Sequence, residues 1–400
     1  MRVLLVEIYG RGGLTHYTYN LARELARRQV EVTLLTGCEY ELATRVSPGG
    51  NGFRVEACFY RRSERWTGRR APARPSRLRR WLKAAEYVLD TPRVVRAYRR
   101  ERADLAHLQG SNPILVVTLA ALKLAGARAV YTAHDVSPLS HRALARLLDQ
   151  LIYRLADCVV VHSDADREAL LGRFHLAPSK VVVIRHGNYL FFRPDGEGDR
   201  AEARRGLGLG ETDRVLLFFG FLSWYKGLDV LLRAFRAVRD ALPQARLVVV
   251  GDPLKLGRGG LAACRRLARD LGVEKSLVLR AEYLPMHEVP PYFVAADCVV
   301  LPYREVSQSG VLHLAYAFGR PVVATRVGGF PEAVREEETG LLVPPEDPAA
   351  LAAALIRLLA DDEARCRMGA AARRAAEEQS CSWAEVAERT RELYGAVAAR

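Results

Sequence analysis

The feature that most constrains the fold is a regular alternation of short Val-, Ile- and Leu-rich runs with amphipathic stretches of helical periodicity. A short apolar run between helical segments is typical of a strand buried on both faces of a parallel sheet. In the first helical stretch, Leu14, Tyr17, Leu21 and Leu25 fall on one stripe that can face such a sheet. The alternation therefore predicts an α/β protein built from β-α-β units.

Two series of these units follow one another along the 400 residues. Strands are expected at 2–6, 30–35, 104–108, 128–132, 158–162 and 181–184, and then at 215–219, 246–250, 277–279, 298–301 and 321–324. The polar, glycine-rich run 194–210 between the series reads as a surface linker. We expect two Rossmann-like, doubly wound parallel-sheet domains facing across a cleft, over 1–193 and 211–380. A last helix in 381–400, opened by an S-x-x-E capping box at Ser382, should pack back toward the first domain.

Composition excludes several classes of protein. A hydrophobic content of 50% with 26% charged residues is globular, and the longest apolar run, 114–122, is shorter than the roughly 20 residues of a membrane span. The first apolar run, 3–6, is too short for a signal peptide. Seven scattered cysteines form no C-x-x-C pair or zinc-ligand cluster, so we expect reduced thiols. The expected location is cytoplasmic.

The net charge of +14 is concentrated in one segment. Fifteen Lys and Arg stand against four acidic residues from Arg61 to Arg102, and Trp66 and Trp81 lie among them. Such a segment can attract anionic lipid, nucleic acid or an acidic acceptor through its field alone, although a solvated, variable insertion explains it equally well. We lean toward peripheral contact with the inner face of a membrane, without specific nucleic-acid recognition.

Loops that follow parallel strands are where ligands bind in such sheets, and two of these loops belong to the first domain. The loop after the first strand pairs Gly12 with Gly13 at the start of a helix, where backbone N–H groups favour anions. It resembles a dinucleotide fingerprint only loosely, even with Glu39 as a ribose-binding acid. His134 follows a mid-domain strand, where a functional role and a structural one are equally probable.

Two loops of the second domain carry phosphate-binding chemistry. Lys226 lies between aromatic residues and a glycine at the start of a helix, so its ammonium group can face a phosphate. A second helix starts with the run Ser307, Gln308, Ser309, Gly310 and Val311, whose N–H groups can hold a diphosphate. Phosphate repels a neighbouring carboxylate, so Glu305 is better suited to accept hydrogen bonds from sugar hydroxyls.

Together these segments resemble the family-4 retaining glycosyltransferases of the GT-B fold. The resemblance rests on FGFLSWYKGLDVLLRAF, YREVSQSGVLHLAYAFGRPVVAT, VGGFPEAV and TGLLVPPEDPAALAAAL in the second half and on GRGGLTHYTYNLARELARRQVEVTLLTG, TAHD and VVVIRHG in the first. It covers nearly the whole chain except 54–102, and it points to a branch with Ser-Gln-Ser-Gly-Val at the helix start.

The resemblance implies roles for the candidate residues. Lys226 and the helix start at 307–311 would bind the diphosphate of a nucleotide sugar, Gly12 and Gly13 would approach its phosphates, and His134 would contact the transferred sugar. Two positions depart from the family pattern: Phe221 replaces its usual arginine and Leu314 its second glutamate. These departures leave the ribose contact open.

The expected function is therefore transfer of a sugar from a nucleotide diphosphate sugar to a saccharide or lipid-linked acceptor, with retention and with no cofactor. The only D-x-D motif, at 164–166, follows Ser163 at a helix start and reads as a cap, so no metal is expected. The alternatives are a polyanion or nucleic-acid binder acting through 61–102, and a GT-B nucleotide-sugar epimerase. The sequence names neither the donor nor the acceptor.

Overall fold

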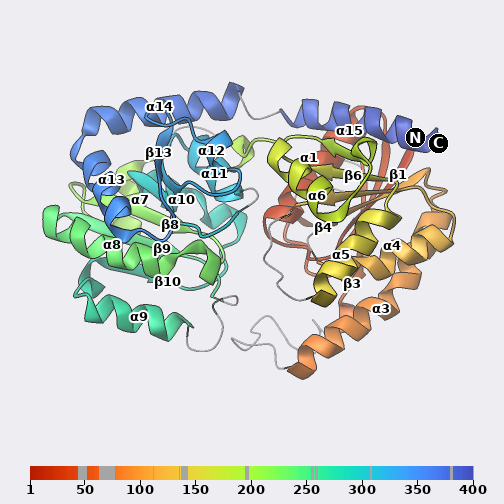
Figure 1. Cartoon of the computed structure of the whole chain (residues 1–400), viewed down its shortest axis with the longest axis horizontal. Coiled ribbons are helices and arrows are strands. Elements are labelled where there is room, and N and C mark those ends of the chain that lie inside the picture. The colour runs from red at the N-terminus through yellow and green to blue at the C-terminus, as the bar shows by residue number, and fades with distance from the viewer. Residues whose placement is uncertain are drawn as a thin grey trace. The chain divides into compact units, whose positions relative to one another are not determined.

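The computed structural model describes residues 1–43, 52–62, 77–110, 112–134, 136, 143–193, 198–253, 256, 260–306, 309–378 and 382–399. The chain forms two compact units: the first is Met1–Gly187 with Cys381–Arg400, and the second is Asn188–Ser380. Each is a parallel sheet covered by helices (Figure 1), so the expected fold class of two parallel-sheet α/β domains is confirmed. None of the described helices is long and apolar enough to cross a bilayer.

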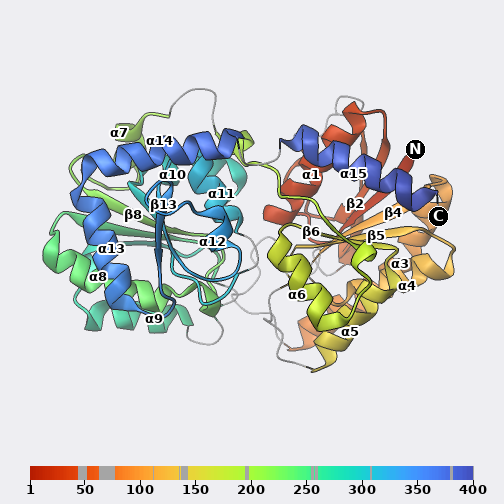
Figure 2. The same ribbon diagram turned by 45° about the horizontal axis from the view of Figure 1, so that its top comes forward.

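The first unit contains, within its described residues, a seven-stranded parallel sheet in the order β3-β2-β1-β4-β5-β6-β7. The strands are β1 (Arg2–Glu7), β2 (Glu31–Gly37), β3 (Arg54–Phe59), β4 (Leu105–Gly110), β5 (Ala129–Ala133), β6 (Cys158–Val161) and β7 (Val181–Val183). The helices are α1 (Gly13–Arg27), α3 (Arg77–Arg100), α4 (Leu115–Leu124), α5 (Ala143–Leu155), α6 (Asp164–Phe174), η2 (Pro178–Lys180) and α15 (Trp383–Ala398). Figure 2 shows α1 and α15 on one face of the sheet and α3, α4 and α5 on the other.

The second unit contains, in the part described, a six-stranded parallel sheet in the order β10-β9-β8-β11-β12-β13. Its strands are β8 (Arg214–Phe219), β9 (Ala245–Val250), β10 (Leu277–Arg280), β11 (Cys298–Leu301), β12 (Val322–Thr325) and β13 (Gly340–Val343). Its helices are η3 (Leu190–Phe192), α7 (Arg200–Gly206), η4 (Trp224–Lys226), α8 (Leu228–Ala241), α9 (Gly260–Asp270), η5 (Glu274–Ser276), η6 (Met286–Glu288), α10 (Pro290–Ala295), α11 (Gly310–Ala317), α12 (Phe330–Ala333), α13 (Pro348–Ala360) and α14 (Asp362–Glu378). Side chains of α10, α11 and α14 pack in one core, and those of α8 and α13 pack in a separate one.

Two strands were not expected from the sequence. β3 is an edge strand that pairs with β2, and charged residues interrupt its apolar pattern. β13 pairs with β12 at the far edge of the second sheet. The segment 54–102, for which the sequence offered no counterpart, thus supplies a strand and a long helix, and Tyr87 and Val94 of α3 are buried in the core of the first unit.

The run expected to be a linker, 194–210, contains the helix α7 and lies within the second unit. Arg204 of this helix is 4% exposed and donates to the Asp297 carboxylate at 2.9 Å, to Ala295 O at 3.2 Å and to Glu211 O at 2.5 Å. The buried ion pair holds the segment against α10, because leaving either charge unpaired in the interior would be costly. The boundary between the compact units falls between Gly187 and Asn188.

The C-terminal helix α15 packs against α1 in the first unit. Ser382 caps it by accepting a hydrogen bond from Glu385 N at 3.1 Å. Trp383 contacts Tyr17 edge-on with ring centroids 5.1 Å apart, and the Tyr394 hydroxyl lies 2.6 Å from His107 Nδ1. These contacts make the last helix part of the core of a unit whose other residues end at Gly187, almost 200 positions earlier in the chain.

Candidate functional site

The candidate residues of the second unit lie where its strand order reverses. In the sheet order, β8 is flanked by β9 and β11, so the chain winds in opposite directions from β8. The loops after β8 and β11 therefore lie at the carboxyl ends of the strands at this reversal point, which is the usual ligand site of such sheets. Lys226 follows β8, and Glu305 and Ser309 follow β11.

Lys226 is held with its amine in the interior of this loop pair. Its side chain is 5% exposed, its Nζ donates to Phe219 O at 3.3 Å, and it lies 5.1 Å from the centroid of the Tyr303 ring. Burial lowers the pKa of this amine from its ordinary value, because removing an ammonium from water disfavours its charged form. A bound anion would restore that charge, so the buried lysine is prepared for a negatively charged ligand.

Gly220 brings Lys226 next to the start of α11. A Cβ built on this glycine would lie 2.7 Å from Lys226 Nζ and 3.3 Å from Val311 Cγ2. The amine and Val311 are therefore separated by no more than the sum of these distances, about 6 Å. Ser309 caps the helix by accepting a hydrogen bond from Leu312 N. Lys226 Nζ thus lies near the side chain of Val311, in the first turn of α11.

Arg304 holds the turn that carries Lys226, and no sequence motif pointed to this arginine. Its guanidinium donates to both carboxylate oxygens of Asp229, at 3.0 and 2.8 Å, and to Trp224 O at 2.6 Å. The Arg304 N–H donates to Tyr225 O at 2.7 Å. These bonds join η4 to the loop after β11, and the bidentate Arg–carboxylate geometry makes the joint specific. No local sequence motif contains this ion pair, because Asp229 and Arg304 are 75 positions apart.

The structure describes only some of the other candidate residues around this loop. Glu305 is half-buried, and within the described ranges its carboxylate makes no hydrogen bond or ion pair. Ser307 and Gln308 lie outside the described residues. Leu314, in place of the family's second glutamate, is buried in the core of the second unit, and Phe221 is 37% exposed beside Tyr283.

The glycine loop of the first unit, after β1, is organised by two carboxylates. Glu7 accepts hydrogen bonds from the N–H groups of Tyr9 and Gly10 and from the hydroxyls of Thr15 and Thr36. Burial raises the pKa of this carboxyl group, and those four hydrogen bonds oppose the shift. A second carboxylate, that of Glu41 in the segment after β2, also reaches the loop.

Glu41 accepts the Gly12 N–H at 2.8 Å and lies 2.9 Å from His16 Nε2. Gly12 has a φ of 86°, a conformation that glycine adopts without strain, and Gly13 begins α1. Glu39, the acid of the alternative dinucleotide interpretation, is paired with Arg11. The loop is therefore compact, and its Gly12 N–H already donates to a carboxylate.

His134 belongs to a cluster of histidines at the end of β5. Its Nδ1 is 3.1 Å from His162 Nε2, and His162 Nδ1 is 2.9 Å from Ile184 O, to which only a protonated nitrogen can donate. Burial lowers the pKa of His134 and of His162, the latter to about 4, so both rings are neutral near pH 7. On its other side, His134 Nε2 lies 2.8 Å from Gln109 Oε1. Contacts on both ring nitrogens hold the ring plane of His134.

The D-x-D motif lies in the first turn of α6, where Ser163 accepts the Asp166 N–H at 3.0 Å. Among the described residues, no group of three or more His, Cys, Asp or Glu side chains could hold a metal ion. The six described cysteines are free thiols.

Two family models match this sequence. The model described as Glycosyltransferase Family 4 matches residues 11–188, and the one described as Glycosyl transferases group 1 matches residues 213–361. A curated relative named D-inositol 3-phosphate glycosyltransferase, from Corynebacterium diphtheriae, is 32% identical over 96% of this chain and 90% of its own length. Its namesake from Streptomyces scabiei is 32% identical over 96% of this chain and 86% of its own length.

Solved structures of similar fold cover almost the whole chain. The structure of Anabaena HepE in complex with UDP and glucose superposes with a TM-score of 0.79 at 22% identity, over 99% of both chains. The sucrose-phosphate synthase of Thermosynechococcus elongatus superposes with a TM-score of 0.77 at 23% identity, over 100% of this chain and 99% of its own. At such identities the likeness concerns the fold.

Proposed function

Because this chain belongs to the family-4 and group 1 glycosyltransferases and has the parallel-sheet units of the GT-B fold, we propose that it is a retaining, metal-independent enzyme using a nucleotide diphosphate sugar. Its acceptor in this proposal is a saccharide or a lipid-linked saccharide. The single observation that carries the donor assignment is the buried amine of Lys226 beside the N-terminus of α11.

The chemistry of the leaving group explains why that arrangement matters. Cleaving the bond between the anomeric carbon and the diphosphate builds negative charge on the phosphate oxygens, which preorganised donors stabilise. Lys226 would supply the cation, and the N–H groups of Ser309, Gly310 and Val311 would supply oriented dipoles. This set can neutralise the leaving group without a divalent ion, which is the basis for proposing metal independence.

The remaining candidates act on the sugar. Glu305, with its carboxylate at the same loop, would accept hydrogen bonds from sugar hydroxyls. The neutral His134, whose ring plane is fixed by His162, would contact the transferred sugar, and Gly12 and Gly13 would allow the donor to approach the backbone. Retention follows the family resemblance: the acceptor attacks from the face that the diphosphate leaves, and the leaving group takes the acceptor's proton.

The names of the relatives suggest where to look for substrates. Curated relatives at 32% identity are named for transfer to D-inositol 3-phosphate, and a structural neighbour was solved with UDP-glucose. A first screen therefore pairs UDP-, GDP-, ADP- and dTDP-sugars with inositol 3-phosphate and with simple saccharides. Ligand-observed NMR would identify the donor before the acceptor is known.

The decisive variant is Lys226→Met, which retains the buried methylenes and removes the ammonium group. We expect binding of the selected nucleotide sugar to weaken by about tenfold to a hundredfold, since a hydrogen bond to a charged group is worth about 1.5–3 kcal/mol. Turnover should fall further. The matched control is Lys275→Met, because Lys275 is exposed in η5 of the same unit. Unchanged donor affinity and turnover in a folded Lys226→Met protein would remove the proposed donor site.

We also propose that the basic segment 61–102 holds the enzyme at an anionic membrane surface. Four apolar side chains of α3 are exposed: Trp81 by 75%, Leu82 by 49%, Val88 by 48% and Leu89 by 63%. Seven residues separate Trp81 from Val88 and Leu82 from Leu89, so the four share one side of the helix. An exposed apolar face on a basic helix is suited to the interface of an anionic bilayer.

Vesicle sedimentation tests this surface. The protein should bind vesicles that contain phosphatidylglycerol and not those of phosphatidylcholine alone, and Trp81→Ser with Leu89→Ser should abolish binding. Leu124→Ser is the control, because Leu124 of α4 is 91% exposed and lies outside the basic segment. Equal vesicle binding by the double variant and the control would exclude α3 as the contact.

A further inference from the structure

One aromatic ring lies against the buried amine of Lys226. The Lys226 Nζ is over the face of the Tyr303 ring, 5.1 Å from its centroid, and both side chains are buried. An ammonium group within about 6 Å of an aromatic centroid is attracted by the negative face of the ring, and the attraction grows where water is excluded. The Tyr303 ring is therefore placed to favour the charged form of Lys226.

Tyr303 follows β11 and is held from several sides. Its carbonyl oxygen accepts a hydrogen bond from the Thr325 hydroxyl, at the end of β12, at 2.5 Å. Its ring packs against that of Phe330 with centroids 5.3 Å apart, and the Ser309 side chain lies next to its hydroxyl. Turning the ring away from Lys226 would break these contacts in a close-packed interior.

The turn that carries Lys226 packs closely against the residue before Tyr303. Gly227 has a φ of +69°, and a Cβ built on it would overlap the carbonyl oxygen of Pro302. Glycine permits this approach, because it has no side chain to collide with that carbonyl group. The separation between the Lys226 amine and the Tyr303 ring is thus set by backbone packing as well as by the two side chains.

Lys226 is held without a carboxylate partner. Within the described ranges, no Asp or Glu oxygen forms an ion pair with its amine, which donates to Phe219 O. Burial lowers the pKa of Lys226, and the Tyr225 phenol opposes this shift. A carboxylate would favour the charged amine more strongly, but its negative charge would repel a diphosphate. A neutral aromatic face avoids that repulsion and leaves the positive charge of the amine for a ligand.

We propose that Tyr303 is a positioning residue that keeps Lys226 charged and in place for the diphosphate of the donor. This role rests on the proposed function, since Lys226 is taken there as a ligand of the phosphates. It requires the ring and not the hydroxyl, because phenylalanine presents a similar face to a cation. Phenylalanine should therefore replace Tyr303, and an aliphatic side chain should not.

Proton titration of the free protein tests this role without any donor. NMR signals of lysine labelled with ¹³C at Cε follow the protonation of each amine, and the chain has six lysines. The signal of Lys226 is assigned by its loss in Lys226→Met. We expect the proton affinity of Lys226 to fall about twofold to thirtyfold in Tyr303→Leu. It should stay at the wild-type value in Tyr303→Phe.

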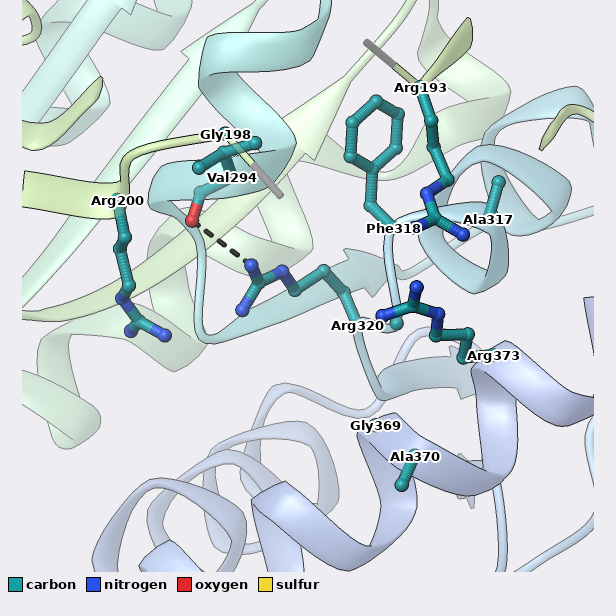
Figure 3. Close-up of a pocket in the computed structure, with 11 residues that line it drawn as sticks. Arg193, Gly198, Arg200, Val294, Ala317, Phe318, Arg320, Gly369, Ala370 and Arg373 are labelled. Carbon is teal, nitrogen blue, oxygen red and sulfur yellow. Dashed lines mark hydrogen bonds between the residues drawn. The ribbon is translucent and has the colours of Figure 1, made fainter. Parts of the chain in front are cut away.

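Phe318→Leu is the matched control, because it removes a ring from the same core at the other end of α11. The Phe318 ring stacks on that of Phe293 with centroids 5.3 Å apart. Phe318 and Arg193 line one pocket at the C-terminal end of this helix (Figure 3). The eight residues of α11 span about 12 Å. The control should leave the proton affinity of Lys226 unchanged, and thermal melts compare the stability of the variants.

Donor titration separates this role from the donor site itself. Affinity for the nucleotide sugar should fall in Lys226→Met and in Tyr303→Leu and be restored in Tyr303→Phe. Suppose that Lys226→Met weakens donor binding while Tyr303→Leu and Phe318→Leu give the same proton affinity for Lys226. The role of Tyr303 would then be overturned, and the donor site would stand. Equal losses of proton affinity in Tyr303→Leu and Tyr303→Phe would overturn the role of the ring. Unchanged donor affinity in Lys226→Met would overturn the donor site and the role of Tyr303 together.

Discussion

Replacing Gly220 with alanine would test the geometry of the proposed donor site with the smallest possible change. Gly220 has a φ of +98°, and a methyl group there would lie 2.7 Å from Lys226 Nζ and 3.3 Å from Val311 Cγ2. The shorter distance is below the van der Waals contact of carbon and nitrogen, so the amine must move away. The methyl group would also occupy the space in which a phosphate is expected.

The expected effect of Gly220→Ala has two parts, a loss of stability and a loss of donor affinity, and a control variant can separate them. A non-glycine residue at such a positive φ costs about 1–3 kcal/mol of stability. Displacing the ammonium from a phosphate oxygen would cost about 1.5–3 kcal/mol of donor binding, or roughly ten- to a hundredfold in affinity. Gly208→Ala is the control for the first part, since Gly208 has a φ of +69° and nothing within 4 Å of an added Cβ.

The assay combines urea unfolding with donor titration. Both variants should lose stability, and only Gly220→Ala should lose affinity for the nucleotide sugar and kcat/KM. If Gly220→Ala bound the donor as tightly as Gly208→Ala, the phosphate would not lie between Lys226 and α11, and the reasoning would fail.

Three further predictions concern other parts of the molecule. Arg304→Ala should lower kcat/KM by about tenfold to a hundredfold in steady-state assays, because it removes the hydrogen bonds that hold the turn carrying Lys226. Arg326→Ala is the control, because Arg326 is exposed. Equal losses of kcat/KM in the two variants would contradict this role of Arg304. Burial lowers the pKa of His107 to about 3 and of His162 to about 4, so the unfolded chain binds more protons than the folded one below about pH 6.5. Urea unfolding of the chain should therefore show stability falling from pH 6.5 toward pH 4, and a flat profile would argue against buried neutral histidines. Turnover should be unchanged by EDTA, and loss that added Mg²⁺ or Mn²⁺ restores would contradict metal independence.

Strand positions were predictable wherever burial dictated the residue types. Cys298–Leu301 was expected residue for residue, and most other strands were placed within two residues at either end. A strand buried on both faces by helices must be apolar throughout, so its sequence carries the signal. β3 was missed because an edge strand that alternates apolar and charged residues looks like part of a basic surface segment.

The position of the candidate loops was also predictable, because Lys226, Ser309 and Gly310 lie in segments that lead from a strand into a helix. The partners that hold them were not. Arg304 reaches Asp229, Glu41 reaches Gly12, and His162 orients His134, each across a sequence separation that leaves no local pattern.

The sequence by itself determined the α/β class, the two series of parallel strands and the loops that could carry phosphate chemistry. These features depend on hydrophobic periodicity and on residues adjacent in the chain, and both are visible in the sequence alone. Only the tertiary structure decided that the run 198–210 belongs to the second unit and which distant groups orient Lys226 and His134. Those outcomes depend on side-chain packing and on buried ion pairs between segments far apart in the chain, and such contacts are specified by the folded arrangement rather than by any local pattern.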